Sequence, residues 1–320
     1  MSAALRVLAP GLMTTVQDLG RIGYQRLGIP VGGALDALSL RAANLLVGNP
    51  PDVGGLEIIA SGPTLAIEAE STRLAFVGAD ADLSATGEAP FSSFDIRVSR
   101  SMLLRRGDIL RVGPLRGSAT LYMAVEGGFD IAPVLGSVST YLRGGLGGFQ
   151  GRSLAAGDVL PLKRNWASER PEQALHTGDF APRSRLRVLE GPQSDHFGEK
   201  ERAAFFRREY VVGPGWNRMG MRLIGEPVTH SRGYNVTSDG IVRGSIQVPA
   251  TDCRSFSSPS TRRPAAIRKS ARSFRPICRR SDGSAWDRGS PSNGSRWKRR
   301  RPLAARTSPS SNACRRAFPR

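Results

Sequence analysis

Cysteine is absent from the first 250 residues of this 320-residue chain. The three cysteines, Cys253, Cys278 and Cys314, all lie in the last 70 residues and form no close pair. Without cysteine, the first 250 residues contain neither disulfide bonds nor thiolate-bound zinc. Their fold therefore has to rest on an apolar core.

Long apolar runs are absent as well. No stretch approaches the roughly 20 apolar residues that a membrane-spanning helix needs. The first ten residues lack the charged start and the apolar core that are typical of a signal peptide. We therefore expect a cytoplasmic protein that does not enter a membrane.

Histidine is scarce, and His176, His196 and His230 show no spacing typical of metal ligands. No Ser-His-Asp arrangement can be argued from them either. The sequence thus predicts no metal site, and each histidine is expected to be a surface or core residue.

The chain has a formal net charge of +19, which is unevenly distributed. The last 70 residues hold 19 of the 46 Lys and Arg and 3 of the 27 Asp and Glu, a net charge of +16. The first 250 residues carry only +3, which is ordinary for an enzyme surface. Because nucleic-acid binding would rest on the tail alone, we expect no specific nucleic-acid partner.

Residues 1–165 are predicted to form the first half of the protein. Short runs rich in Val, Ile, Leu and Phe alternate with Gly, Pro and Asp at a spacing of about ten residues, which indicates a β-barrel or sandwich. The expected strands cover residues 5–9, 56–60, 64–69, 73–77, 109–112 and 120–125. Residues 36–47 are expected to be helical, with Leu38, Ala42, Leu45 and Leu46 on one buried face.

Residues 166–184 look like a connection, and residues 185–250 like a truncated second half that starts with a strand. Residues 251–320 differ in kind, because Arg, Ser and Pro make up 38 of these 70 residues and no periodicity is visible. Such a segment buries too little apolar surface to offset its chain entropy, so we expect it to be disordered.

Glycine-rich motifs carry the most specific information. The longest is Thr-Thr-Val-Gln-Asp-Leu-Gly-Arg-Ile-Gly at residues 14–23, continued by Gly-Ile-Pro at 28–30, Gly-Ala-Leu-Asp at 33–36 and Ala-Asn-Leu-Leu-Val-Gly-Asn at 43–49. Further motifs lie at residues 126–129, 135–140, 147–152, 191–193, 217–223, 238–240 and 244–249. Over residues 5–250 the chain resembles a family of carboxyltransferase-type proteins related to urea amidolyase. Its members are known as the C-type subunit of 5-oxoprolinase, KipI antagonist or allophanate hydrolase subunit 2.

This resemblance implies a mainly β fold of cyclophilin-like β-barrel domains with a few short helices. It implies a subunit of an ATP-dependent 5-oxoprolinase, a hydrolase that opens 5-oxoproline to glutamate together with an A-type subunit and a KipI-like B-type subunit. Two alternatives stay open: a carboxyltransferase subunit of a urea carboxylase or allophanate hydrolase system, and a regulatory protein that binds a KipI-like kinase inhibitor. ATP would be shared with the partner subunits. No biotinyl-lysine motif occurs, so no biotin is expected on this chain.

Candidate catalytic residues are Asp18, Arg21 and Asp36. Asp18 and Arg21 are three residues apart in a glycine-flanked turn, where either they face one cavity or they form a structural pair. The planar guanidinium of Arg21 suits a carboxylate or another oxyanion. Asp36 is either a catalytic carboxylate or a carboxylate that complements the helix dipole.

Candidate substrate- or anion-binding residues lie in or beside these motifs. Asn44 is expected on the helix, and Asn49 after it is either a ligand contact or a turn former. Arg143 and Arg152 lie on either side of the glycine-rich residues 144–151. Arg218 and Arg222 form a second pair, four residues apart. The glycine-rich residues 144–151 lack the Gly-Lys-Ser/Thr ending of a phosphate-binding P-loop, so we expect tight turns there.

The family pattern stops after residue 250, and residues 251–320 are interpreted as an out-of-frame translation. Loss of one G after Thr251 turns Thr-Gly-Leu-Pro into the Thr-Asp-Cys-Arg that is present. The neighbouring frame across residues 261–282 can encode the Gln-Thr-Thr-Gly-Gly-Tyr-Pro-Lys segment of the relatives. A product without its native last strands is expected to be aggregation-prone, and its activity stays open.

Overall fold

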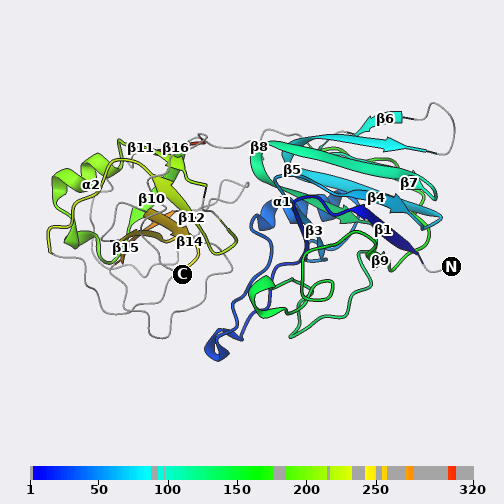
Figure 1. The fold of residues 1–320 in the computed structure, drawn as a ribbon, viewed down its shortest axis with the longest axis horizontal. Coiled ribbons are helices and arrows are strands. Elements are labelled where there is room, and N and C mark those ends of the chain that lie inside the picture. Colours follow the sequence, from blue (N-terminus) through cyan, green and yellow to red (C-terminus); the bar gives the residue numbers. More distant parts are fainter. Residues whose placement is uncertain are drawn as a thin grey trace. The chain divides into compact units, whose positions relative to one another are not determined.

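The computed structural model describes residues 3–87, 93–96, 98–175, 185–214, 217–232, 242–249, 254–257, 271–276 and 302–307. The chain divides into two compact units, Met1–Pro182 and Arg183–Arg320. Figure 1 shows the ribbon of both units. Among the described residues, no helix has both the length and the apolar character required to cross a membrane.

Unit 1 contains a nine-stranded sheet with strand order β2-β3-β8-β4-β1-β9, to which β5 adds β6 and β7. The strands are β1 (Ala4–Ala9), β2 (Met13–Gln17), β3 (Gly55–Ile59), β4 (Thr64–Ile67), β5 (Ser71–Thr86), β6 (Ser93–Ile96), β7 (Ser101–Arg105), β8 (Ile109–Val125) and β9 (Val159–Pro161). All their pairings are antiparallel.

The sheet curls because its two longest strands carry irregularities. The register of β5 against β8 shifts between Gly78 and Asp80 and again between Ala81 and Leu83. Such bulges bend a strand and increase its twist. Strand β8 consequently pairs with β5 along one edge and with both β3 and β4 along the other. The two strands predicted at 109–112 and 120–125 are one continuous strand, since the glycines between them lie in this bent region.

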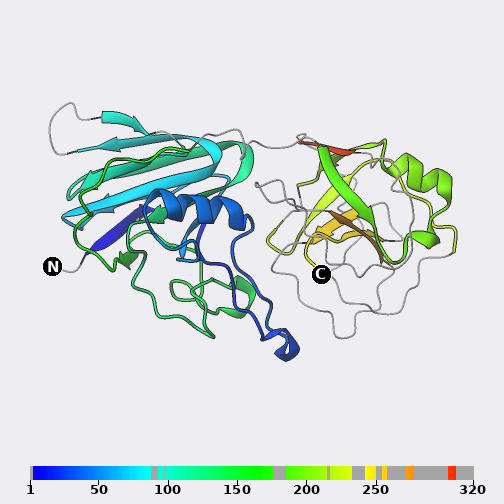
Figure 2. The same ribbon diagram turned by 180° about the vertical axis from the view of Figure 1, so that it is seen from behind.

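Helix α1 (Ala37–Leu46) lies against one face of the curled sheet (Figure 2). Leu40, Ala43 and Leu46 are buried against sheet residues that include Ala75, Val77, Tyr122 and Ala124. The predicted helix is confirmed, but the predicted apolar face is wrong in part. Leu38 and Leu45 are exposed, because the spacing that faces the sheet runs through residues 40, 43 and 46.

The opposite face of the sheet holds the larger apolar core. Val7, Leu56, Ile58, Phe76 and Met123 belong to this cluster and are buried. Because alternate residues of a strand point to opposite faces, β2, β3 and β8 are covered on both sides. A polar side chain on the α1 side of these strands is therefore enclosed by protein.

Unit 2 forms a closed barrel with the strand order β10-β15-β13-β14-β12-β11-β16. Its elements are β10 (Arg185–Glu190), α2 (Glu199–Phe205), β11 (Glu209–Val212), β12 (Gly220–Ile224), β13 (Ile246–Pro249), β14 (Arg254–Ser257), β15 (Ala271–Pro276) and β16 (Pro302–Thr307). Val188, Phe205, Tyr210, Leu223 and Ile246 form its core.

The mainly β fold expected from the sequence is confirmed. The structure differs from the expectation for residues 251–320 at three places, where β14, β15 and β16 occupy positions in the barrel. Ladder hydrogen bonds join backbone groups, so strands do not require an alternating side-chain pattern. The other residues of this segment lie outside the described part of the chain, and their expected disorder stays a prediction.

Candidate functional site

Two long loops of unit 1 meet beside the end of β2. The first runs from β2 to α1 and carries the short helix η1 (Gln25–Leu27), and the second runs from β8 to β9 and carries η2 (Leu142–Gly144). Figure 1 shows them as the dark blue and green loops that leave the same side of the sheet. The glycine motifs recognised in the sequence lie mainly in these loops.

Asp18 follows β2 directly and fastens the second loop to the first. Its Oδ1 accepts hydrogen bonds from the Gly20 amide at 2.7 Å, the Ser137 hydroxyl at 2.7 Å and the Ser139 hydroxyl at 2.5 Å. Its Oδ2 accepts one from the Val138 amide at 2.8 Å. The carboxylate thus accepts four hydrogen bonds from neutral donors, and three of them join the first loop to residues 137–139 of the second.

Arg21 is almost completely buried, with 1% of its surface exposed. Its Nη2 donates to the carbonyl oxygen of Ser139, whereas its Nε and Nη1 have no hydrogen-bond partner among the described residues. Burial lowers the pKa of the Arg21 guanidinium, and the nearby Asp18 carboxylate acts to raise it. A buried guanidinium with unsatisfied N–H groups is suited to bind an oxyanion.

Glycines allow the backbone to approach this guanidinium closely. A Cβ on Gly147 would lie 2.5 Å from Arg21 Nη2 and 2.3 Å from the Ser139 carbonyl oxygen, and its φ of +69° favours glycine. On the other side, a Cβ on Gly32 would lie 3.5 Å from Arg21 Nη1. The prediction of tight turns at residues 144–151 agrees with the left-handed φ angles at Gly145, Gly147 and Gly148.

Sequence reasoning missed Gln17, the last residue of β2. Its side chain is fully buried, and its Nε2 donates to Thr15 Oγ1 at 3.0 Å and to the Thr140 carbonyl oxygen at 3.2 Å. Its Oε1 has no partner among the described residues. A signal was present, because Gln17 lies inside the longest motif and in a strand whose neighbours are buried.

A buried carboxylate on β3 was missed as well. Glu57 lies opposite Thr15 of β2 and Tyr122 of β8, so the three side chains share the α1 side of the sheet. Glu57 Oε2 accepts hydrogen bonds from Tyr122 Oη at 2.7 Å and from the Leu35 amide at 2.8 Å. A single carboxylate between Leu56 and Ile58 was the available signal.

Asp36 is the N-cap residue of α1. Its carboxylate accepts from the amides of Leu38 at 3.0 Å and Ser39 at 3.2 Å, and from the Ser39 hydroxyl at 2.5 Å. The second of the two alternatives left open by the sequence, a helix-terminal carboxylate, accounts for all these contacts.

We expect Asp36→Ala to lower the free energy of unfolding by about 0.5–2 kcal/mol, as the loss of an N-cap does. The activity of the folded variant should stay within about twofold of wild type, because every hydrogen bond that this carboxylate makes with the described residues lies within its own helix. Thermal unfolding and activity measured on the same sample check this. A loss of activity beyond tenfold without unfolding would restore a catalytic role.

Asn44 and Asn49 form a buried pair that closes the end of α1. Asn44 Nδ2 donates to the Val53 carbonyl oxygen at 2.7 Å, and its Oδ1 accepts from Asn49 Nδ2 at 3.0 Å. Asn49 also bonds to the Val125 carbonyl oxygen and the Gly127 amide. These contacts give both residues a structural part, and they agree with the interpretation of Asn49 as a turn former.

Arg152 is held by residues close to it in the sequence. Its two terminal nitrogens bind both carboxylate oxygens of Asp158 at 2.7 Å, and one of them also bonds to Gln150. The hydrogen bonds with Asp158 raise the pKa of Arg152 and lower the pKa of Asp158. Arg152 therefore braces the loop, whereas Arg143 lies exposed on η2.

Arg218 and Arg222 belong to unit 2. Arg218 is buried, and burial lowers its pKa to about 10. Arg222 lies on β12 and is half-buried. Both remain candidates for anion binding within unit 2.

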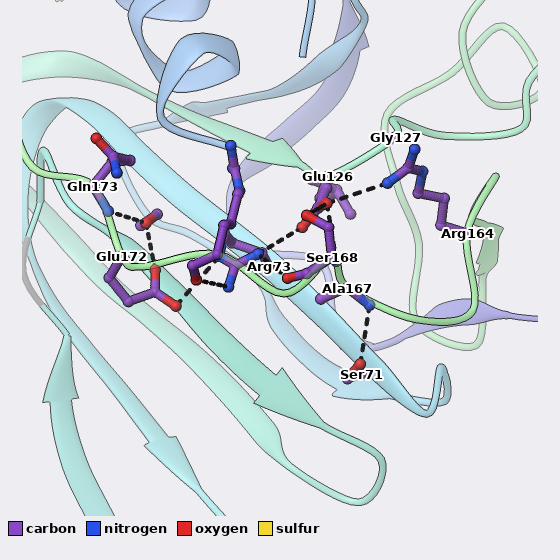
Figure 3. A network of polar contacts seen from close by, with 12 residues as sticks. Ser71, Arg73, Glu126, Gly127, Arg164, Ala167, Ser168, Glu172 and Gln173 are labelled. Atoms are coloured by element: carbon purple, nitrogen blue, oxygen red, sulfur yellow. Dashed lines mark hydrogen bonds and ion pairs between the residues drawn. The ribbon is translucent and has the colours of Figure 1, made fainter. Parts of the chain in front are cut away.

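A second polar cluster in unit 1 fastens residues 163–175 to the sheet. Figure 3 shows Arg73 of β5 pointing toward Glu126 on one side and Glu172 on the other. Arg73 donates to Glu126 at 2.9 Å, to Glu172 at 3.3 Å, and to the carbonyl oxygens of Ser168 and Arg170, each at 2.9 Å. Each of its three guanidinium nitrogens donates at least one hydrogen bond within the protein, so this cluster is structural.

Comparison with known proteins places these motifs in a family. The sequence profile of the carboxyltransferase domain, subdomains A and B, matches residues 27–254. The C-type subunit of 5-oxoprolinase from Escherichia coli strain K12 is 34% identical over 247 residues, which cover 77% of this chain and 76% of that protein. The corresponding protein of Haemophilus influenzae is 31% identical over 235 residues, 73% of each chain.

Urea amidolyases match over a similar region. That of Saccharomyces cerevisiae is 33% identical over 233 residues, which are 69% of this chain and 12% of the yeast protein. The crystal structure of the Kluyveromyces lactis urea amidolyase superposes with a TM-score of 0.74 at 27% identity, covering 95% of this chain and 18% of that one. The chain thus matches a small part of the urea amidolyases and about three quarters of a C-type 5-oxoprolinase subunit. It belongs to the family of carboxyltransferase domains, subdomains A and B.

Proposed function

We propose that this chain is a subunit of an ATP-dependent 5-oxoprolinase, which opens the lactam of 5-oxoproline to glutamate. The observation that carries the proposal is the similarity to the C-type subunit of that enzyme over three quarters of both chains. The buried Arg21 supports it, since 5-oxoproline bears a carboxylate that can bind a guanidinium whose Nε and Nη1 have no partner in the described part of the chain.

An amide is a poor electrophile, and ATP supplies a phosphoryl group that makes the lactam carbon more reactive. On this chain, Arg21 would hold an oxygen of the substrate, and the Asp18-bonded loops would fix the position of Arg21. Residues 144–151 do not connect a strand to a helix, so they do not form a nucleotide-binding P-loop. We therefore assign most of the ATP contacts to the partner subunits, which are proposed to be of the A type and of the KipI-like B type.

The test is reconstitution. The chain should be mixed with the A-type and B-type subunits from the same source, and ADP and glutamate should be measured with and without 5-oxoproline. We expect ADP and glutamate to form in equal amounts only when all subunits and 5-oxoproline are present. ATP hydrolysis that does not depend on 5-oxoproline in the complete mixture would contradict the proposal.

A carboxyltransferase subunit of a urea carboxylase system is the second candidate. It is favoured by the superposition on the Kluyveromyces lactis urea amidolyase, which covers nearly all of this chain. Biotin would then have to be carried by a partner. Urea-dependent ATP hydrolysis with a biotin carboxylase and its carrier protein, and none with 5-oxoproline, would select this candidate.

We also propose that residues 251–320 are encoded out of frame. The family profile ends at residue 254, close to the point where the composition changes. Sequencing of the coding DNA across codons 248–256 tests this. An additional G after codon 251 would restore Gly-Leu-Pro-Ile-Val and make the tail a sequencing error, whereas a confirmed frame would place the shift in the gene itself. A neighbouring frame across codons 261–282 that does not encode Gln-Thr-Thr-Gly-Gly-Tyr-Pro-Lys would reject the proposal.

A further inference from the structure

Gln17 has an amide group whose orientation is fixed by its surroundings. The Thr140 carbonyl oxygen, 3.2 Å from the Gln17 amide, can only accept a hydrogen bond. The NH₂ side of the amide therefore faces Thr140, and the Oε1 side has no partner among the described residues. A buried acceptor without a hydrogen bond lowers the stability of a protein by about 1–3 kcal/mol. No contact of β2 compensates for this loss at Gln17 Oε1 among the described residues.

Arg21 bonds to the neighbouring residue of the same loop. Its Nη2 bonds to the carbonyl oxygen of Ser139, the residue that precedes Thr140. Gln17 and Arg21 therefore contact the same two-residue stretch of backbone. Within the described part of the chain, Gln17 has an unsatisfied acceptor, and Arg21 has two unsatisfied donors and a positive charge.

The groups around this pair do not satisfy those atoms. The Asp18 carboxylate accepts from four neutral donors, and the Thr140 hydroxyl donates to the Val16 carbonyl oxygen at 3.0 Å. Gly147 and Gly148 lie directly over the same stretch, where a Cβ on Gly148 would lie 1.9 Å from Thr140 Oγ1.

We infer that Gln17 and Arg21 form one site for a small cyclic amide that bears a carboxylate. Gln17 Oε1 accepts the hydrogen bond of the amide N–H, and Arg21 Nε and Nη1 donate to the carboxylate. The inference rests on the proposed function and deepens it, because it names Gln17 as the residue that recognises the lactam N–H. Neutral urea would leave the charge of Arg21 without a counter-ion.

Binding of three ligands to the full-length chain tests the inference by calorimetry. These are 5-oxoproline, N-methyl-5-oxoproline, which lacks the N–H, and 2-pyrrolidinone, which lacks the carboxylate. We expect 5-oxoproline to bind at least about tenfold more tightly than either analogue, as the loss of one buried hydrogen bond to a charged or polar group implies. Equal binding of 5-oxoproline and the N-methyl analogue would overturn the inference, as would no binding of 5-oxoproline.

Gln17→Met separates recognition from folding. In this variant, 5-oxoproline and its N-methyl analogue should bind within about twofold of each other, because the acceptor is gone. Gln25→Met, in the exposed helix η1, is the matched control and should keep the tenfold preference. Should Gln17→Met not unfold cooperatively, Gln17→Asn, which withdraws the amide by one methylene, is measured instead.

A preference for 5-oxoproline that persists in a folded Gln17 variant refutes the role of Gln17. This outcome is distinguishable from failure of the proposed function. Selective binding of 5-oxoproline without ATP hydrolysis in the reconstituted mixture would reject the enzyme assignment and leave the site. ATP hydrolysis that depends on 5-oxoproline, together with an unchanged preference for 5-oxoproline in the Gln17 variant, would keep the enzyme assignment and reject the role of Gln17.

Discussion

Arg21→Met is expected to lower kcat/KM for 5-oxoproline by about 10²–10³ in the reconstituted enzyme while the chain stays folded. Removing one preorganised donor from an oxyanion site typically has an effect of this size. Arg21 combines near-complete burial with N–H groups that have no partner among the described residues, and the proposed function assigns a substrate oxygen to them.

The stability of this variant should change little. Burial opposes the charge of Arg21, as its lowered pKa reflects, and a methionine of similar length fills much of the same volume. Asp18 keeps its four neutral donors, so the two loops remain fastened together.

Arg26→Met is the matched control, because Arg26 lies exposed on the same loop. It should retain the activity of wild type. Arg21→Lys keeps a positive charge without the planar fork and should recover only part of the activity. An Arg21→Met enzyme with normal kcat/KM and a normal unfolding temperature would remove Arg21 from the site.

The largest expected loss of stability follows from Arg73→Met, at about 3–5 kcal/mol. Arg73 and Glu126 are 3% and 6% exposed, so the substitution removes the buried ion-pair partner of Glu126 and leaves this carboxylate with the exposed Arg164, at 3.3 Å. It also removes the bonds that hold the Ser168 and Arg170 carbonyl oxygens over β5 (Figure 3). Urea unfolding monitored by fluorescence measures the change.

Arg116→Met provides the comparison, because Arg116 pairs with Asp82 at 2.6 Å on the surface. Both partners are largely exposed, so its loss should have no measurable effect on unfolding. Replacing Arg73 and Glu126 together by methionine should recover part of the loss, since the buried carboxylate is then removed with its buried partner. A single Arg73→Met variant as stable as wild type would show that the cluster does not hold residues 163–175 in place.

Acid should weaken the same cluster. Burial acts to raise the pKa of Glu126, but the hydrogen bonds from Ser168 and Arg73 outweigh it and hold the pKa below its ordinary value of 4.5. A carboxyl group with a lowered pKa in the folded state stabilises the fold above its unfolded pKa and loses this contribution as the pH falls. Glu126→Gln should therefore show a smaller decrease in stability below pH 4.5 than wild type, measured by thermal unfolding across that range.

Local features of the sequence were enough to predict the class of fold, the helix at residues 36–47 and the family. Strands at 5–9, 56–60 and 64–69 were predictable because alternation and glycine punctuation are local properties. Their positions agree with β1, β3 and β4 to within two residues. The glycine motifs likewise marked the loops that surround Asp18 and Arg21 before their geometry was known.

Only the folded chain reveals which buried polar side chains lack a hydrogen-bond partner among the described residues. Arg21 and Arg152 look alike in the sequence, yet Arg152 is neutralised by Asp158 six residues away. The carbonyl oxygen that holds Arg21 comes from Ser139, 118 residues away, and two donors of Arg21 stay unsatisfied among the described residues. Gln17 is distinguished for the same reason, because its partner Thr140 is 123 residues away. Hydrogen-bond saturation depends on contacts between distant segments, and neither residue type nor spacing encodes such contacts locally.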